Sequence, residues 1–154
     1  MLSARLIQMI EDHAEELTRS VIDDLKSNKL TTHYHRLSDS ELYERTYDVY
    51  RHLGNWVSHE REGAIEATFS VLGEHRYSEG VPASEVVWAL TLTKHHLRDY
   101  IHYAGVVDSA VELYQQQELR RLVGHFFDKA IFYTVRGHEH AAAAPQHAKA
   151  RHAA

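Results

Sequence analysis

Residues 81–103, VPASEVVWALTLTKHHLRDYIHY, form the stretch that decides the fold. Apolar and small residues recur in it at steps of three and four, which keeps one side of an α-helix facing inward. This side comprises Val86, Ala89, Leu90, Thr93, Leu97, Tyr100, Ile101, Tyr103 and Ala104. Such a stripe is too wide for a two-stranded seam and suits a helix that packs against several neighbours. We therefore expect a central packing helix with His95, Asp99 and His102 on its solvent side.

Four other segments carry helical periodicity, and together they predict an all-α bundle of about five helices. They span residues 3–28, 38–57, 64–76 and 109–137. Gly63, Gly80 and Gly105 stand between elements, where helix-stop signals are expected. The inner stripe of the last helix comprises Leu119, Leu122, Val123, Phe126, Ala130 and Tyr133.

Local signals mark the starts of two helices. Ser38 is followed by Glu41 at the spacing of a capping box, in which the hydroxyl and the carboxylate bind backbone N–H groups. Asp108 or Ser109 can cap the last helix. Gly54 lies on the apolar face of the second helix, where it leaves room for another helix to come close.

The first helix carries a heptad-like stripe. Its residues alternate steps of three and four: Ile7, Ile10, Ala14, Leu17 and Val21. Such a seam packs either on the core of its own chain or on the same helix of a second subunit. We favour core packing combined with a contact between two copies, so a homodimer formed through helices is expected.

Composition limits the partners and the compartment. The chain has 17 Lys and Arg against 22 Asp and Glu, a net charge of −5, and no long basic run, which argues against nucleic acid or an anionic membrane as a partner. It has no cysteine, and no apolar run approaches the roughly 18 residues of a membrane span. We expect a cytoplasmic protein with one domain over residues 1–137. The Ala- and His-rich segment 138–154 holds no aliphatic residue larger than alanine, so we expect a disordered tail there.

The sequence contains no recognisable catalytic constellation. A phosphate-binding glycine loop, a dinucleotide-binding fingerprint and the zinc motif H-E-x-x-H are all absent. The Glu-x-x-His motif of di-iron bundles is absent as well. No nucleophile and base can be paired from their spacing. We therefore expect no enzymatic activity, no metal site and no cofactor.

Three residues are candidates for a ligand pocket: His75, His96 and Tyr100. His75 lies on the expected apolar face of the third helix, where an interior hydrogen-bonded histidine is the commoner meaning. The other residues of that face are Ala64, Ile65, Thr68, Val71 and Leu72. His96 shares the apolar side of the central helix with Tyr100. The alternative function is therefore a haem- or small-ligand-binding globin-like sensor that uses His96. The 14 histidines also leave pH or metal sensing open.

The order of motifs along the chain resembles a known family. The segment LGEHRYSEGVPASEVVWALTLTKHHL resembles the linker and central helix in the N-terminal sensory domains of RsbT co-antagonist proteins. In that pattern an arginine near a helix end precedes a glycine, a small or proline turn, an acidic residue and an aliphatic helix. The matching residues are Arg76, Gly80, Pro82, Glu85, Val86, Ala89 and Leu90. The segments YHRLSDSELYERTYDVYRHL and LVGHFFDKAIFYTV look like the family's second and last helices, so the similarity covers roughly residues 3 to 137.

The resemblance implies a globin-like helical fold without haem that dimerises and passes a signal on. In relatives the domain precedes an anti-sigma-antagonist (STAS) module of the stressosome, or a histidine kinase, whereas here only the Ala- and His-rich segment follows. The expected function is a non-catalytic sensory or regulatory domain of bacterial signal transduction and stress response. Its expected partners are a second copy and a STAS-type protein or kinase in trans. Signals are expected to pass through the first and last helices.

Overall fold

The computed structural model describes residues 4–58, 61–104 and 109–153, with side chains up to residue 144. Within these ranges the chain is helical and contains no strand, which confirms the all-α prediction. The elements are α1 (Ala4–Asp12), α2 (Ala14–Ser27), the 3-10 helix η1 (Thr32–Arg36), α3 (Asp39–Arg51), α4 (Leu53–Trp56), α5 (Glu62–Ser78), α6 (Ala83–Ala104) and α7 (Ala110–Ala153).

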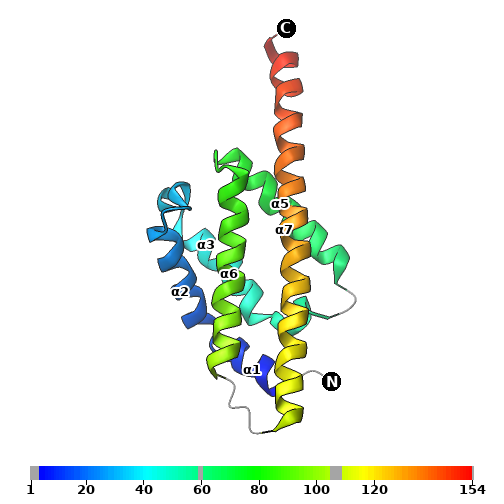
Figure 1. The fold of residues 1–154 in the computed structure, drawn as a ribbon. Coiled ribbons are helices and arrows are strands. Elements are labelled where there is room, and N and C mark those ends of the chain that lie inside the picture. Colours follow the sequence, from blue (N-terminus) through cyan, green and yellow to red (C-terminus); the bar gives the residue numbers. More distant parts are fainter. Residues whose placement is uncertain (1–3, 59–60, 105–108, 154) are drawn as a thin grey trace.

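Helix α6 lies between α2 and α7 (Figure 1) and packs on both. Its buried side chains are Val86, Ala89, Leu92, Thr93, Leu97 and Ile101. Most of the predicted inner face is therefore confirmed, and Leu90 is half-buried beside it. The prediction that Tyr103 faces inward is wrong, because its side chain is 82% exposed, although Ile101 in the same last turn is buried.

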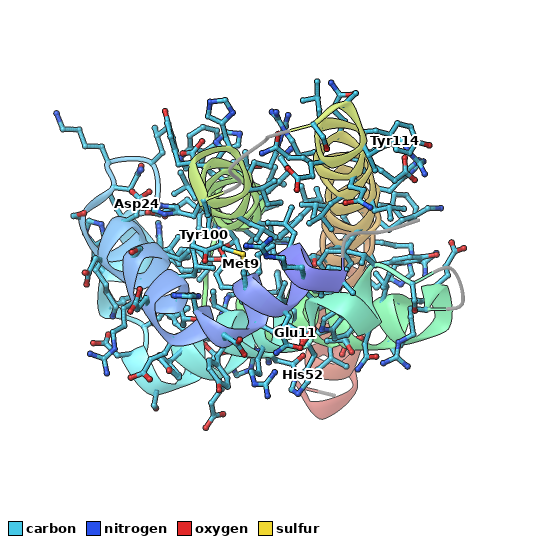
Figure 2. All side chains as sticks on the ribbon, turned by 90° about the horizontal axis from the view of Figure 1, so that it is seen from below. Met9, Glu11, Asp24, His52, Tyr100 and Tyr114 are labelled. Atoms are coloured by element: carbon cyan, nitrogen blue, oxygen red, sulfur yellow. The ribbon has the colours of Figure 1, made fainter. Side chains whose placement is uncertain are left out.

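Two of the expected helices are broken in the structure. The first divides at His13, where the backbone leaves helical geometry (φ −102°, ψ 16°) and the ring Nδ1 lies 2.7 Å from the carbonyl oxygen of Met9. The second divides at His52, between α3 and α4. Glu11 on α1 reaches this second break, where its Oε1 accepts a hydrogen bond from the Gly54 N–H at 3.2 Å (Figure 2). Both bends keep an apolar stripe facing one core.

The stripe of the first helix packs on the chain's own core. Ile10, Ala14, Leu17 and Val21 are buried within the single chain, and Ile7 is half-buried against the same cluster. The core packing that we favoured for this stripe is thus what the structure shows. A contact with a second copy stays a prediction, and it would have to use other side chains.

Helices α5 and α7 cross at van der Waals distance through glycines. A Cβ atom built on Gly73 would lie 2.0 Å from the carbonyl oxygen of Thr134, and one built on Gly137 would lie 2.2 Å from that of Ser70. No side chain fits at either position, because the backbone of the other helix already fills the space. The inner stripe of α7 is buried as predicted.

Helix α7 is 44 residues long and extends past the other helices at its C-terminal end (Figure 1). Ser109 caps its start, with Oγ accepting a hydrogen bond from the Glu112 N–H at 3.2 Å, whereas Asp108 lies outside the described residues. The helix end expected near Gly137 is wrong, because α7 continues to Ala153. Alanine has the highest helix propensity, which favours this continuation. The domain boundary at residue 137 stays a prediction.

Candidate functional site: a buried arginine beside an internal cavity

Helix α5, helix α3 and η1 meet at one end of the bundle. Gly80 ends the α5 segment with φ +77°, a left-handed conformation that glycine adopts without strain. The Val81 N–H then donates to the carbonyl of Arg76 at 3.0 Å, so the chain turns directly into α6. The His33 N–H of η1 donates to Oε1 of Glu85 in the first turn of α6 at 2.8 Å. This junction is held by hydrogen bonds on both sides of the turn.

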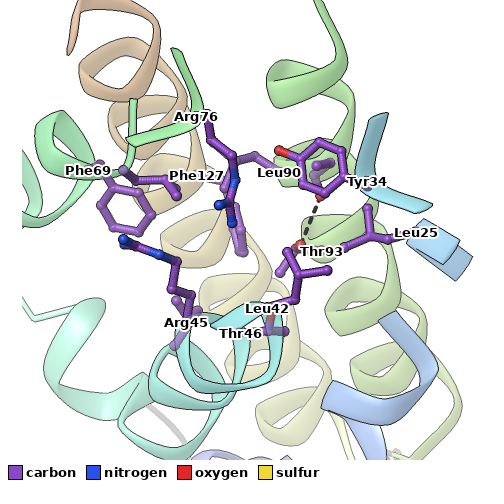
Figure 3. Close-up of a pocket in the computed structure, with 13 residues that line it drawn as sticks. Leu25, Tyr34, Leu42, Arg45, Thr46, Phe69, Arg76, Leu90, Thr93 and Phe127 are labelled. Atoms are coloured by element: carbon purple, nitrogen blue, oxygen red, sulfur yellow. Dashed lines mark hydrogen bonds between the residues drawn. The ribbon is translucent and has the colours of Figure 1, made fainter. Parts of the chain in front are cut away.

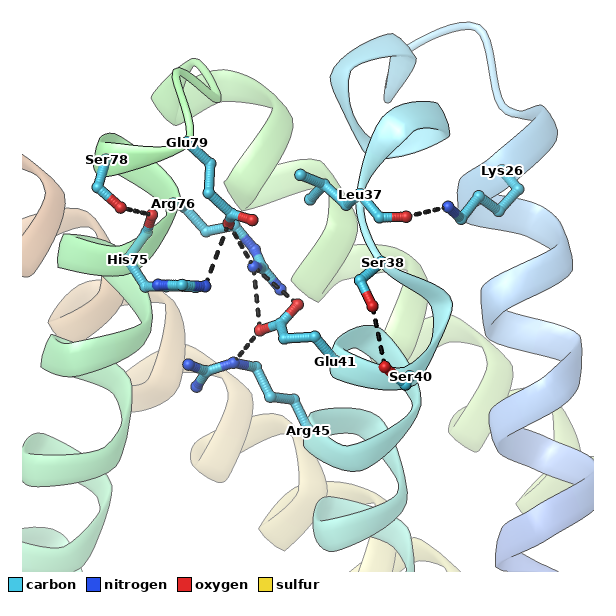
Figure 4. Close-up of polar contacts among 10 residues, drawn as sticks. All are labelled: Lys26, Leu37, Ser38, Ser40, Glu41, Arg45, His75, Arg76, Ser78 and Glu79. Carbon is cyan, nitrogen blue, oxygen red and sulfur yellow. Dashed lines mark hydrogen bonds and ion pairs between the residues drawn. The ribbon is translucent and has the colours of Figure 1, made fainter.

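Arg76 is the buried charge at this junction, with only 3% of its surface exposed. Its Nη1 donates to Glu41 Oε1 at 3.1 Å and to Glu79 Oε1 at 2.8 Å (Figure 4). Its guanidinium carbon lies 5.4 Å from the centre of the Tyr34 ring, a cation–π contact. Arg45 also binds Glu41, through its Nε. The charges therefore compensate one another, as burial requires.

These contacts keep the cluster ionised at neutral pH. Burial by itself would raise the pKa of Glu41, but Arg76 and Arg45 outweigh it and hold that pKa below its ordinary value. Burial likewise disfavours the charged guanidinium, yet Tyr34, Glu41 and Glu79 raise the pKa of Arg76. Burial raises the pKa of Tyr34 to about 12, so its hydroxyl stays protonated.

A cavity of about 50 Å³ opens beside Arg76 (Figure 3). Helices α2, α3, α5, α6 and α7 and η1 all contribute to its wall, which is mainly apolar: Leu25, Tyr34, Leu42, Arg45, Thr46, Val49, Phe69, Leu72, Arg76, Ala89, Leu90, Thr93 and Phe127. The Nε atom of Arg76 is buried and has no hydrogen-bond partner. A buried polar atom without a partner is costly, so this N–H is a donor that a bound molecule could satisfy.

A second hollow of about 230 Å³ lies next to the cavity, between α3 and α5. Arg45, Val49, Phe69 and Leu72 belong to both walls. The remaining wall of the hollow is Glu44, Asp48, Trp56 and Thr68. The two spaces thus share an apolar partition, and Arg45 lies on it at the α3 side.

The capping box predicted at the start of α3 is not formed. Ser38 is the residue before the helix, as predicted, but its hydroxyl makes no cap bond and lies 2.9 Å from the Ser40 hydroxyl (Figure 4). The carboxylate of Glu41 turns to Arg76 instead. An ion pair with a buried arginine is stronger than a hydrogen bond to one exposed backbone N–H, which explains the choice.

Of the three residues predicted for a ligand pocket, His96 and Tyr100 lie one turn apart on α6 and His75 lies on α5. None of them lines the cavity beside Arg76. His75 is exposed, and its Nε2 lies 3.6 Å from Glu79 Oε1. His96 is half-buried, with Nε2 at 2.8 Å from Asp24 Oδ2 on α2. The Tyr100 ring lies 5.8 Å from the ring of His13.

The position of His75 corrects the inner face predicted for the third helix. The buried residues of α5 are Ile65, Phe69, Leu72, Gly73 and Arg76, whereas the predicted Val71, Thr68 and His75 are exposed. The true face repeats at steps of four, three and four and ends on a charged residue. We missed Arg76 as a core residue because an arginine at a helix end is normally solvated.

The His96 pair bears on the haem alternative. An axial ligand needs a free ring nitrogen that points into an apolar cavity. Here Nε2 is engaged with the Asp24 carboxylate, and this contact with His96 helps to lower the pKa of Asp24 although burial opposes it. Binding iron through this atom would first break the pair.

Among the described residues, no three histidine, aspartate or glutamate side chains converge in a way that could hold a metal ion. None of the described helices combines the length and the apolar character that a membrane crossing requires. No family model, no curated protein and no solved structure matches this chain.

Proposed function

We propose that this chain is a non-catalytic sensory or regulatory domain with a globin-like arrangement, which signals through protein contacts as a homodimer. The observation that carries the proposal is the form of α7. One part of this helix is buried against α5 and α6, and its C-terminal part extends beyond the bundle (Figure 1). A long helix anchored in a core and projecting from it is suited to transmit a movement of that core.

The Arg76 junction is linked to the point where α7 leaves the bundle. His138 on α7 lies with Nε2 at 2.8 Å from the carbonyl oxygen of Val81, in the turn between α5 and α6. Tyr77, the neighbour of Arg76, packs its ring edge-on against the His138 ring, with centroids 5.3 Å apart. Any rearrangement around Arg76 that moves this turn therefore also moves α7. The junction supports the role of signal input, and α7 that of output.

The outward side of α7 supports a contact between two copies. Val111, Tyr114 and Phe132 are large apolar side chains exposed on it. Tyr114 is labelled near the start of α7 in Figure 2. The stripe of the first helix is mostly buried in the core of its own chain. The outward side of α7 is therefore the surface that we propose for the homodimer and for a STAS-type or kinase partner in trans.

Sedimentation of the purified chain tests the dimer. We expect a mass about twice the 17.8 kDa of one chain at micromolar concentration. Phe132→Glu should shift the protein to monomer, because a charge would be placed in the contact. Leu30→Glu is the matched control, since Leu30, like Phe132, is a large apolar residue that is exposed, but it lies between α2 and η1. A wild-type chain that stays monomeric would refute the homodimer.

The output role of α7 is tested with two spin labels, one at exposed Glu139 on α7 and one at exposed Glu74 on α5. We expect the distance distribution between them to change when Arg76 is replaced by lysine, which cannot bridge Glu41 and Glu79 in the same geometry. The replacement of Arg121 by lysine, in an exposed pair on α7, is the control. An unchanged distribution in the Arg76→Lys variant would show that the junction does not control α7.

A further inference from the structure

We propose that the cavity beside Arg76 binds a small uncharged molecule with an apolar body and one hydrogen-bond-accepting oxygen, such as a carbonyl. The oxygen accepts the Nε–H of Arg76, and the body lies against Phe69 and Leu72. The binding site stands on its own geometry. The further statement, that the bound molecule is the signal, rests on the proposed function.

The unpartnered donor is the first reason. Arg76 is 97% buried, since 3% of its surface is exposed, and it lines the cavity (Figure 3). Its Nη1 is fully used by Glu41 and Glu79, whereas its Nε has no partner. Buried guanidinium donors are normally satisfied by protein, water or ligand. A molecule in the cavity therefore gains a charge-assisted hydrogen bond from a donor that is already fixed in position.

The charges of the side chains around the cavity favour an uncharged molecule. The two arginines at the cavity, Arg45 and Arg76, face the two carboxylates of Glu41 and Glu79. Glu44 and Asp48 add negative charge at the neighbouring hollow. A carboxylate ligand would meet uncompensated repulsion there, and a cation would meet the guanidinium group. A neutral oxygen acceptor meets neither penalty.

The size of the molecule follows from the two volumes. Engineered apolar cavities of about 150 Å³ take up benzene, so the 50 Å³ beside Arg76 alone holds only the head of such a molecule. The adjoining hollow of 230 Å³ has room for a ring-sized body. Phe69 and Leu72 form part of the partition between them, and Arg45 is the one long flexible side chain on it. The proposal requires Arg45 to rotate away from Glu41, to which its Nε is bound, so that the two spaces join.

The occupant would act on the same contacts that hold the junction. The guanidinium group of Arg76 binds Glu41 on α3 and Glu79 at the end of α5. An oxygen bound to its Nε would shift this group and both of these contacts. Binding there is thus coupled to the turn that His138 contacts. Through these contacts, ligand binding in the cavity can change the position of α7, and no second binding site is needed.

Nuclear magnetic resonance of the full chain tests the site with three probes that share a phenyl ring. Acetophenone carries a neutral carbonyl, ethylbenzene has no acceptor, and benzoate is charged. We expect acetophenone to shift the Nε–Hε signal of Arg76 and the amide signals of Thr46 and Phe69. We expect its affinity to exceed that of either other probe by about tenfold, the factor that one charge-assisted hydrogen bond contributes.

A blocking variant gives the matched comparison. Ala89→Ile places a larger side chain in the cavity wall, and Ala67→Ile makes the same change at an exposed position on α5. Acetophenone should lose at least tenfold in affinity for the first variant and keep its affinity for the second. If Ala89→Ile does not fold, the Arg76 Nε–Hε signal of the wild type decides the question alone.

Three outcomes would overturn the inference. The first is that no probe shifts the Nε–Hε signal of Arg76, which would leave only water in the cavity. The second is that benzoate binds as tightly as acetophenone. The third is that a folded Ala89→Ile variant binds acetophenone as tightly as the wild type. Failure of the proposed function has a different signature. In that case acetophenone binds as expected, but the spin-label distance between α5 and α7 does not change.

Discussion

Replacing Gly137 by alanine tests the close crossing of α5 and α7. The added Cβ would lie 2.2 Å from the carbonyl oxygen of Ser70 and 2.9 Å from its Cα, both of them backbone atoms of α5. A backbone inside a helix cannot rotate away as a flexible side chain can. The clash is therefore relieved only if the two helices move apart, and that movement loosens the buried side chains on either side of the crossing.

The magnitude follows from two opposing effects. Alanine is favoured over glycine inside a helix by about 1 kcal/mol. Overpacking a well-filled core costs roughly 1–3 kcal/mol and occasionally more, and a contact of 2.2 Å with a backbone belongs at the upper end. We expect the free energy of unfolding to fall by about 2 kcal/mol. At roughly 2–4 °C per kcal/mol for a chain of this size, the melting temperature falls by about 4–8 °C.

The matched control lies on the same helix. A Cβ on Gly124 would meet no atom within 4 Å, so Gly124→Ala should only gain helix propensity and stabilise by about 0.5–1 kcal/mol. Urea unfolding followed by circular dichroism measures both variants, with equal slopes confirming that the unfolded states are comparable. Gly73→Ala, 2.0 Å from Thr134 on the other side of the crossing, should behave like Gly137→Ala. Equal stability of Gly137→Ala and Gly124→Ala would refute the crossing.

Three other predictions concern the junction and the helix starts. Arg76→Met leaves Glu41 and Glu79 without their buried partner and should lower the free energy of unfolding by about 3–5 kcal/mol in urea unfolding; a loss below about 1 kcal/mol would contradict the cluster. The pKa of Glu41 is lower in the folded chain than its ordinary value of 4.5, so its stabilising contribution is complete above that value and is lost as pH falls through the folded pKa. Glu41→Gln should therefore flatten the acid side of the stability–pH curve, and parallel curves would show that its carboxylate is not stabilised by folding. Ser109→Ala removes the cap of α7 and should cost about 1 kcal/mol, whereas Ser38→Ala, whose hydroxyl makes no cap bond, should cost less than half of that; a larger loss in thermal unfolding for Ser38→Ala would reverse this assignment.

The sequence predicted the helices well because helical periodicity is a property of the local chain. The inner stripe of α7, from Leu119 to Tyr133, and most of the inner face of α6 are buried as the spacing indicated. Ser109 caps its helix as predicted, since a cap involves residues only three apart. Local patterns did not reveal the bends at His13 and His52. An apolar stripe can continue through a bend, so the periodicity does not register the break.

The candidate site could not be predicted from local patterns, because its parts come from different helices. Glu41 has the spacing of a capping box, yet its carboxylate binds Arg76, 35 residues away in sequence. His75, His96 and Tyr100 all fell on expected apolar faces, but in the structure each contacts a different residue: Glu79, Asp24 and His13, respectively. Only the family resemblance singled out Arg76 in the sequence, and that resemblance gave no contact for it.

The amino-acid sequence by itself determined that the chain is all-helical and which side of most helices faces the core, since both depend on residues within a few turns of one another. The tertiary structure alone decided that an arginine is buried, that two glycines let α5 and α7 touch, and that a cavity remains beside Nε of Arg76. These features depend on the distance and angle between helices. Those quantities are set by the sum of all packing contacts, which no single stretch of sequence contains.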